Sequence, residues 1–178
     1  ATETESDQYG LYAQWRIKPV DRLTLISGGR FSWYDATSGS SEVKVDGEFT
    51  PYAGIIYDLT DSLSAYASYT QIFQPQSVID VSTGDIMKPR TGDQYEVGLK
   101  AELGDNLNAS LAWFDLTDEN RAVSVAGSAG DYLPLGKAHL RGIEFEINGE
   151  ILPGWEAMAG YTYTDTVYEN TTRAAGSE

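Results

Sequence analysis

The residues with the clearest catalytic potential are one histidine and two serines that precede it. His139 is the single histidine among 178 residues, and Ser124 and Ser128 lie in the polar stretch before it. A histidine activates a hydroxyl group when a carboxylate orients the imidazole beside that hydroxyl. The spacing selects neither serine, so a solitary exposed histidine is the simpler interpretation. We expect the chain to have no catalytic residues and not to be an enzyme.

The sequence also lacks a clear pattern for a metal site or a phosphate-binding loop. The chain contains no cysteine, which excludes disulfides and thiolate sites. His139 and the loop aspartates lack a metal-ligand spacing. The glycine-rich stretch 127–130 has neither the lysine nor the flanking helix of a phosphate-binding loop. We therefore expect no metal site, and no cofactor that the chain binds directly.

The charge balance is strongly acidic and excludes one class of partner. The sequence has 27 acidic residues against 12 lysines and arginines, a formal net charge of −15. Proteins that bind nucleic acid present a basic surface to the phosphates. No apolar run approaches the roughly 18 residues of a membrane-spanning helix. The acidic charge therefore argues against a nucleic-acid partner. A membrane-spanning helix is also not expected, so any membrane crossing would use extended strands.

Alternation of apolar and polar residues is the dominant pattern of the chain. Leu107, Leu111 and Trp113 occupy odd positions, whereas Asn108 and Ser110 occupy even ones. Successive side chains of a strand point to opposite faces, so such a segment has one apolar side and one polar side. Strands of about ten residues with this pattern are typical of transmembrane β-barrels.

We predict about eight such strands. Short turns and long loops alternate between them, which is typical of outer-membrane barrels. Their predicted ranges are 8–17, 23–34, 48–57, 63–73, 93–103, 107–117, 138–150 and 155–166. Long loops are expected at 35–47, 74–92 and 118–137, and a further polar loop at 167–178. In an up-and-down sheet, all the long loops then lie at one edge, as the extracellular loops of outer-membrane barrels do.

The two faces differ in charge. The apolar set is expected to face lipid and comprises Leu23, Leu25, Phe31, Ala53, Ile55, Tyr57, Val97, Leu99, Ala101, Leu103, Leu107, Leu111, Trp113, Ile143, Phe145, Ile147, Trp155, Ala157 and Ala159. The opposite set is expected to face inward and comprises Gln14, Arg16, Arg30, Glu96, Lys100, Glu102, Glu144, Glu146 and Glu156. A lysine or arginine on the lipid face at mid-membrane costs about 2–4 kcal/mol, which explains the segregation.

The fold class predicted is all-β: an antiparallel up-and-down meander of about eight long strands, part of a transmembrane β-barrel. Two alternatives stay open. One is a complete eight-stranded outer-membrane barrel that acts as an adhesin or structural protein. The other is a soluble β-sheet module that binds a partner. A narrow eight-stranded barrel is filled by side chains, and an excess of inward glutamates is easier to solvate in a wider lumen.

Four segments resemble the barrel of TonB-dependent ferric-siderophore receptors, especially the ferric-coprogen and ferripyoverdine receptors. The segments are 50–76 (TPYAGIIYDLTDSLSAYASYTQIFQPQ), 27–31 (SGGRF), 91–100 (TGDQYEVGLK) and 141–149 (RGIEFEING), the last leading into Gly154-Trp155 and 160–163 (GYTY). The resemblance implies a 22-stranded barrel with an N-terminal plug, which imports ferric siderophores through the outer membrane with energy from the TonB complex.

The resemblance covers the barrel segment alone. No plug, no TonB box and no terminal aromatic residue are visible, and the sequence finishes with Ala174–Glu178. We therefore expect residues 1–178 to be a partial barrel domain, an internal piece of a receptor in the bacterial outer membrane. Expected partners of the parent are a ferric siderophore, outer-membrane lipid and, through missing regions, the TonB complex. The piece itself is expected to self-associate through its sheet edges.

In the family, the ligand lies between barrel wall, loops and plug. The inward residues near the extracellular edge are Arg30, Tyr34, Tyr52 and Phe114, and the resemblance makes them candidates for contact with the ferric siderophore. An arginine suits an anionic chelate, and a tyrosine suits stacking and hydrogen bonding. The alternative is structural: Arg30 pairs with an inward glutamate, and the aromatic rings fill the wall.

Overall fold

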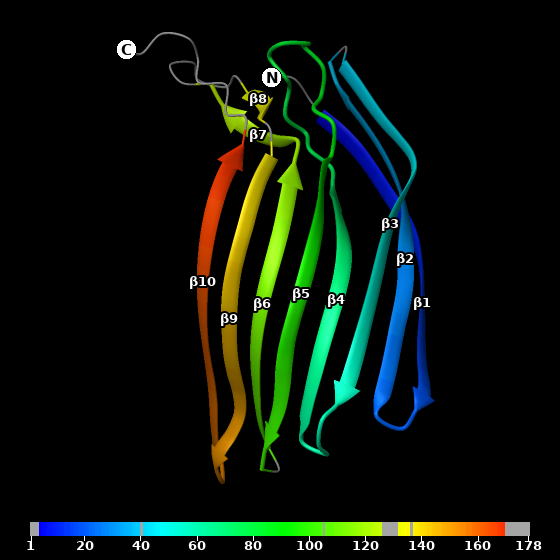
Figure 1. Cartoon of the computed structure of the whole chain (residues 1–178). Helices are drawn as coiled ribbons and strands as arrows, with labels where there is room; N and C mark the ends of the chain where they lie inside the picture. Colours follow the sequence, from blue (N-terminus) through cyan, green and yellow to red (C-terminus); the bar gives the residue numbers. More distant parts are fainter. Residues whose placement is uncertain (1–3, 40, 105, 126–131, 136, 170–178) are drawn as a thin grey trace.

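The protein is an open, twisted antiparallel sheet of eight long strands (Figure 1). The computed structural model describes residues 4–39, 41–104, 106–125, 132–135 and 137–169. The strands of the sheet are β1 Thr4–Val20, β2 Leu23–Ser38, β3 Ser41–Asp58, β4 Leu63–Gln74, β5 Arg90–Leu103, β6 Leu107–Glu119, β9 Lys137–Leu152 and β10 Trp155–Glu169. A separate hairpin consists of β7 Arg121–Ser124 and β8 Tyr132–Leu135. The predicted all-β meander is thereby confirmed.

The connections are sorted by the end of the sheet at which they lie (Figure 1). Short turns join β1 to β2, β3 to β4, β5 to β6 and β9 to β10 at one end, called here the turn end. The opposite end, called the loop end, carries the segment 75–89 and the β7–β8 hairpin. This sorting follows from the up-and-down order β1-β2-β3-β4-β5-β6-β9-β10.

The predicted long loop at 35–47 is wrong. β2 and β3 continue as a paired hairpin as far as Ser38 and Ser41. The polar, serine-rich composition of this stretch concealed the alternation of Val43 and Val45. Other strands are also longer than predicted, and residues 167–169 belong to β10 instead of a loop. The remaining tail lies outside the described residues.

A β-bulge in β3 decides what the extended hairpin does. The register passes from Ser32 opposite Glu48 to Tyr34 opposite Val45, so β3 holds an extra residue there. Gly47 has a φ of 75°, a conformation that favours glycine. The extra residue moves the odd-numbered residues of β3 to the other face. Val43 and Val45 therefore pack beside Tyr34 and Ala36, whereas Phe49 remains on the apolar face.

The register joins the apolar positions into continuous rows across the sheet. One row crosses all eight strands and consists of Ile17, Leu25, Ile55, Ala67, Val97, Trp113, Ile143 and Tyr163. Leu25 and Ala67 are half-buried and the other six members are exposed, with values of 48% for Val97 and 49% for Ile143. An apolar surface of this extent needs a hydrocarbon environment or a partner to cover it. We call this face the outer face.

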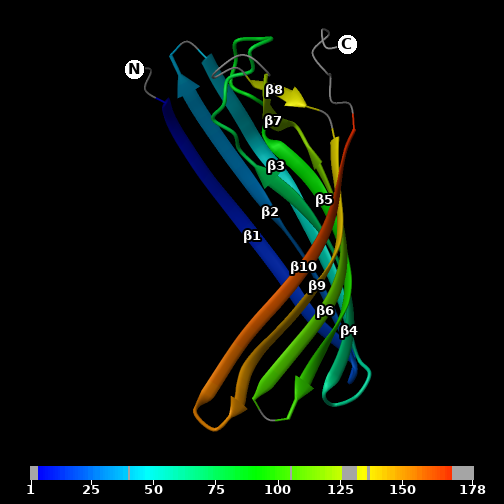
Figure 2. The same cartoon turned by 90° about the vertical axis from the view of Figure 1, so that its left-hand side faces the viewer.

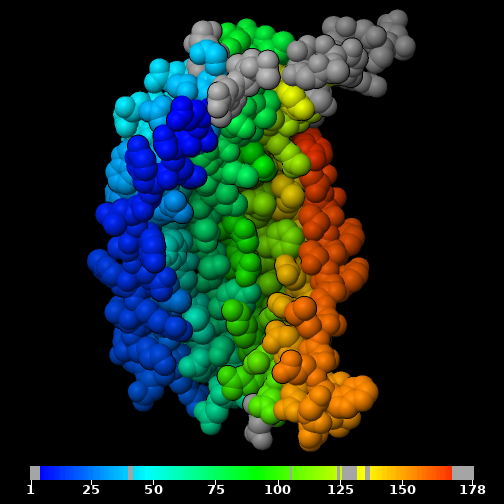
Figure 3. Space-filling model, turned by 180° about the vertical axis from the view of Figure 1, so that it is seen from behind, coloured from blue at the N-terminus to red at the C-terminus, as the bar shows by residue number. Residues whose placement is uncertain are grey.

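The row one residue away has the opposite character. It includes Arg16, Ser68, Glu96 and Thr164, and it lies on the face that we call the inner face. Figures 2 and 3 show that the sheet curves and that one side is hollowed between β1–β3 and β9–β10. The polar inner face lines this hollow, and the two-faced pattern expected from the sequence is present in the sheet.

Glycines on the inner face let aromatic rings lie against the backbone of the neighbouring strand. A Cβ at Gly98 would lie 2.7 Å from Cε1 of Tyr66 and 2.6 Å from the carbonyl oxygen of Leu111. A Cβ at Gly54 would meet nothing closer than 3.7 Å. Both glycines lie within strands of the same sheet, so they form a matched pair.

Gly98→Ala is expected to lower the free energy of unfolding by about 1–3 kcal/mol, because the methyl group overpacks a site bounded by backbone. Gly54→Ala is the control and is expected to change it by less than about 0.5 kcal/mol. Guanidinium unfolding of the detergent-folded protein measures both. Equal effects of the two substitutions would contradict the packing explanation.

Candidate functional site

The inner face brings three of the four predicted ligand residues onto one wall. Arg30 on β2 lies opposite Thr50 of β3, and Tyr52 lies opposite Gly28 two residues farther along. Phe114 lies on β6, beyond β4 and β5, opposite Glu96. All occupy the same face by register. Their role in ligand contact stays a prediction.

The rings of Tyr52 and Phe114 lie against glycines of adjacent strands. Cζ of Tyr52 is 2.6 Å from where a Cβ of Gly28 would be, and Cε1 of Phe114 is 2.7 Å from that of Gly142. The Tyr52 hydroxyl donates a hydrogen bond of 2.9 Å to Oε1 of Gln14. Both rings therefore cover wall backbone, and both residues are half-buried.

Arg30 is exposed, and its guanidinium lies over Gly10 of β1. The structure shows no ion pair for Arg30 among the described residues, so the expected pairing with an inward glutamate is not seen there. An exposed guanidinium on a concave wall keeps its donors available for carboxylate or phosphate-like oxygens.

Tyr34 has a different environment from the other three candidates. It is 6% exposed and lies in an apolar cluster with Ala36 and Ile86, flanked by Val43, Val45 and Ile79. Its hydroxyl donates to the carbonyl oxygen of Gln76 at 3.4 Å, and burial raises the pKa of this phenol. Tyr34 thus anchors the segment 75–89 on the β2–β3 hairpin.

A polar cluster halfway along the wall was not singled out in the sequence. The Tyr66 hydroxyl donates to Oε1 of Glu96 at 2.6 Å, and Gln94 Nε2 donates to Oε2 of Glu96 at 3.2 Å. Nζ of Lys100 lies 4.8 Å from the centre of the Tyr66 ring. The alternation of Tyr66 with Ala65 and Ala67 was a usable signal, because it places the tyrosine inward.

The inner face is hollowed near the turn end. A cavity of about 590 Å³ is bordered by Arg16, Lys18 and Lys100, and by the carboxylates of Asp58 and Glu146. Charges of both signs lie around it. Such a surface suits a polar occupant that carries complementary charges.

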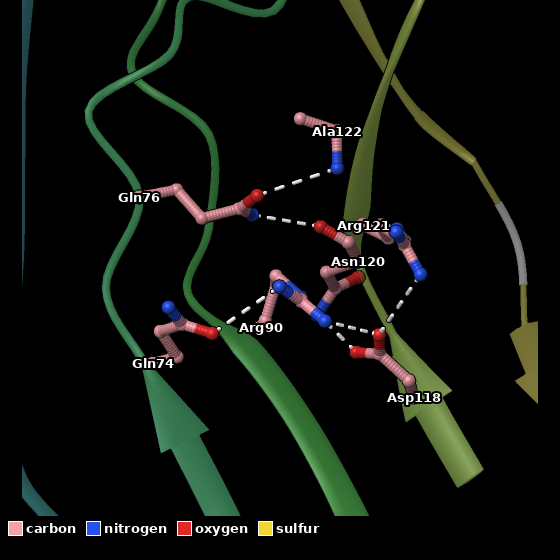
Figure 4. Close-up of polar contacts among 7 residues, drawn as sticks. All are labelled: Gln74, Gln76, Arg90, Asp118, Asn120, Arg121 and Ala122. Carbon is pink, nitrogen blue, oxygen red and sulfur yellow. Dashed lines mark hydrogen bonds and ion pairs between the residues drawn. The ribbon is translucent and has the colours of Figure 1, made fainter.

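A hydrogen-bonded clasp holds the loop end together (Figure 4). Nε2 of Gln76 donates to the carbonyl oxygens of Lys88 and Asn120, each at 2.7 Å, and its Oε1 accepts the N–H of Ala122 at 3.3 Å. Gln76 is 9% exposed, so the side chain is buried and fully bonded. No sequence pattern pointed to this glutamine, because its partners depend on the path of the segment 75–89.

An ion-pair group lies beside the clasp. Arg90 forms an ion pair with Asp118 and donates to Oε1 of Gln74 at 3.2 Å, and Arg121 lies 4.0 Å from the same aspartate. The Asp118 side chain is 10% exposed, so its charge depends on these two guanidinium groups. The pair fixes the start of β5 to the end of β6.

His139 lies on the outer face, on the loop-end side of the apolar rows. Its Nδ1 is 3.3 Å from Oγ1 of Thr117, and its Nε2 is 3.5 Å from Oε1 of Glu169. Thr117 is paired with Asp93 and His139 across the ladders on both sides, so the strand geometry leaves no turn or helix start beside it for an oxyanion hole. Ser128 and the Ser124 side chain lie outside the described residues.

Within the described ranges, no group of three or more histidines, aspartates and glutamates is arranged to hold a metal ion. The same part of the chain contains no helix long and apolar enough to span a membrane. The stretch 127–130, considered above for phosphate binding, lies outside the described residues.

Comparison with known proteins adds the family context. The family model described as "TonB dependent receptor-like, beta-barrel" matches residues 1–178. The ferripyoverdine receptor of Pseudomonas aeruginosa is 41% identical over 171 residues, covering 90% of this chain and 21% of that protein. The ferric-pyoverdine BN7/BN8 receptor of Pseudomonas putida is 40% identical over 173 residues, covering 91% and 21%. The chain thus spans about a fifth of the length of these curated relatives.

A solved structure shows the same arrangement of strands. The crystal structure of the ferripyoverdine receptor of the outer membrane of Pseudomonas aeruginosa, bound to ferripyoverdine, matches with a TM-score of 0.81 and 37% identity. The match covers 94% of this chain and 24% of that chain. The matched proteins are described as receptors and not as enzymes.

Asp118→Asn is expected to loosen the loop end by about 1–3 kcal/mol, because it removes the charge that compensates Arg90 and Arg121. Trypsin should then cut after Arg90 or Arg121 roughly tenfold faster or more, since local opening exposes these bonds. Asp46→Asn is the control, because its ion pair with Lys44 at 3.9 Å is largely exposed. Equal cleavage rates in the two variants would contradict this account.

Proposed function

The chain belongs to the TonB-dependent receptor-like β-barrel family, and on that premise we propose that it forms part of the barrel of a receptor that binds and imports ferric siderophores. In this proposal the receptor lies in the bacterial outer membrane, the apolar rows of the outer face contact lipid, and the loop end is extracellular. Residues 1–178 are one portion of the barrel domain. The TonB complex acts through regions outside this chain.

The observation that carries the proposal is the open sheet with one face dominated by exposed apolar rows. β1 and β10 are the two ends of the strand order, and neither is paired on its outer edge within the described residues. A strand edge in hydrocarbon must be paired, since each unsatisfied backbone group there costs several kcal/mol. The sheet therefore requires further strands beside β1 and β10, which agrees with a larger barrel. A closed eight-stranded barrel would pair β1 with β10.

Two relatives guide the ligand class. The relatives are named as receptors for ferripyoverdine and ferric pyoverdine. We extend this ligand class, an iron chelate, to the protein that contains this chain. In this proposal the ferric siderophore is cargo and not a resident cofactor. Arg30, Tyr52 and Phe114 are the wall residues proposed to contact it, and Tyr34 is proposed to act by supporting the loop end.

Deletion of the complete reading frame that encodes this chain is expected to abolish growth on at least one ferric siderophore under iron limitation. Uptake of ⁵⁵Fe presented as ferripyoverdine, ferrichrome and ferrioxamine B measures the effect directly. A protonophore should stop uptake but leave binding to cells intact, because TonB-dependent transport draws on inner-membrane energy.

Unchanged uptake of every ferric siderophore in the deletion strain would contradict the proposal. Purification of the isolated chain provides an independent check. Two unpaired edges and an apolar face predict self-association unless detergent or lipid is present. Sedimentation as a stable monomer in plain buffer would instead support a soluble module.

A further inference from the structure

Three segments at the loop end are connected through a single side chain. Gln76 lies near the start of the segment 75–89 and Lys88 lies near its end, and the Gln76 side chain joins the two. The same side chain bonds Asn120, which lies between β6 and β7, and Ala122 of β7. The Gln76 backbone accepts the Tyr34 hydroxyl from β2. We refer to the segment 75–89 together with β7 and β8 as the lid.

The lid has a second junction away from Gln76. The N–H of Val81 donates to the carbonyl oxygen of Tyr132 on β8 at 3.0 Å, and Asp80 forms a parallel bridge with Tyr132. Ile79 and Ile86 meanwhile pack on the apolar cluster around Tyr34 and Ala36. The segment 75–89 therefore contacts β8 at its far side and the β6–β7 turn at its base.

Gln76 and Gln74 differ in burial and in the number of hydrogen bonds that their side chains form. Gln74 is exposed and accepts one hydrogen bond, from Arg90. Gln76 is buried and satisfies two carbonyl oxygens and one N–H that belong to separate segments. Removing its amide leaves all three backbone groups without that partner in a place where water replaces it poorly.

We propose that Gln76 is a positioning residue that makes the segment 75–89 and the β7–β8 hairpin open and close as one unit over the loop end. Nδ2 of Asn120 also donates to the carbonyl oxygen of Pro89 at 3.2 Å, and Val81 bonds Tyr132. The Gln76 side chain adds bonds to Lys88, Asn120 and Ala122 at once, so the joint motion depends strongly on the clasp. A further part rests on the proposed function: a lid that opens as one unit slows the escape of a ferric siderophore from the inner wall.

Amide hydrogen exchange of the complete protein in detergent tests the coupling without any ligand. The reporters are three N–H groups: Ala122 at the clasp, Met87 within the segment 75–89, where it donates to Val78 at 2.8 Å, and Val81 at the contact with β8. In Gln76→Met, all three should exchange about tenfold faster or more, because loss of the clasp lowers the opening free energy of the unit. Gln74→Met is the matched control and should leave all three unchanged.

Faster exchange at Ala122 alone would overturn the proposal, because it would show a local bond without coupling. Equal acceleration in Gln74→Met would overturn it as well. Amides of β5 and β6 between Val97 and Leu111 serve as the fold check and should stay unchanged. Acceleration there would mean that Gln76 supports the whole sheet, which also overturns a specific role in the lid.

Ferripyoverdine is the probe that tests whether the lid slows the escape of a ferric siderophore. Stopped-flow measurement should show about tenfold faster dissociation in Gln76→Met with an unchanged association rate, since the residue is buried within the lid and acts on release. Equal dissociation rates with accelerated exchange would overturn the effect on release. Failure of the unsubstituted protein to bind ferripyoverdine counts against the proposed ligand class, and the exchange measurement still decides the coupling.

Discussion

The two-residue period of the β-strand is the constraint on which the rest of this structure depends. Each long strand presents one side chain outward and the next inward, and the antiparallel register carries this alternation unchanged across eight strands. The row from Ile17 to Tyr163 contains no charged residue, whereas the adjacent row contains Arg16 and Glu96. A slip of one residue anywhere would place charges in the apolar face, so the register is fixed by solvation.

The register shifts at three places among the described strands, and the shift between β2 and β3 has a function in the fold. The extra residue near Gly47 reverses the faces of β3 just beyond the apolar rows. Beyond this point no hydrocarbon needs to be covered, so valines are free to turn inward and form a small core with Tyr34 and Ile86. That core and the Gln76 clasp together hold the segment 75–89. The loop end is therefore stabilised by hydrogen bonds and local packing, which the exposed apolar rows do not supply.

Much of the sheet could be predicted from the sequence because its signals are local. The alternation in 107–113 and 143–147, the turn residues after every second strand and the resemblance of 50–76 all act over a few residues. The β2–β3 hairpin was missed because serine and glycine composition normally marks a loop. The Gln76 clasp could not be predicted, since its partners Lys88, Asn120 and Ala122 meet only once the segment has folded over the end of the sheet. The four candidate ligand residues occupy the expected face, but only the folded structure shows that Tyr34 packs against the segment 75–89.

The central claim, that one face of each strand contacts hydrocarbon and the other contacts water, has a direct test in this cysteine-free chain. Single cysteines would be introduced at each of residues 107–114 of β6, spin-labelled, and studied in the complete protein in lipid bilayers. The account predicts that collisions with oxygen are highest at Leu107, Ala109, Leu111 and Trp113, and that collisions with a water-soluble nickel chelate are highest at Asn108, Ser110, Ala112 and Phe114. Uniform access of the nickel chelate to all eight positions, without a two-residue period, would contradict it.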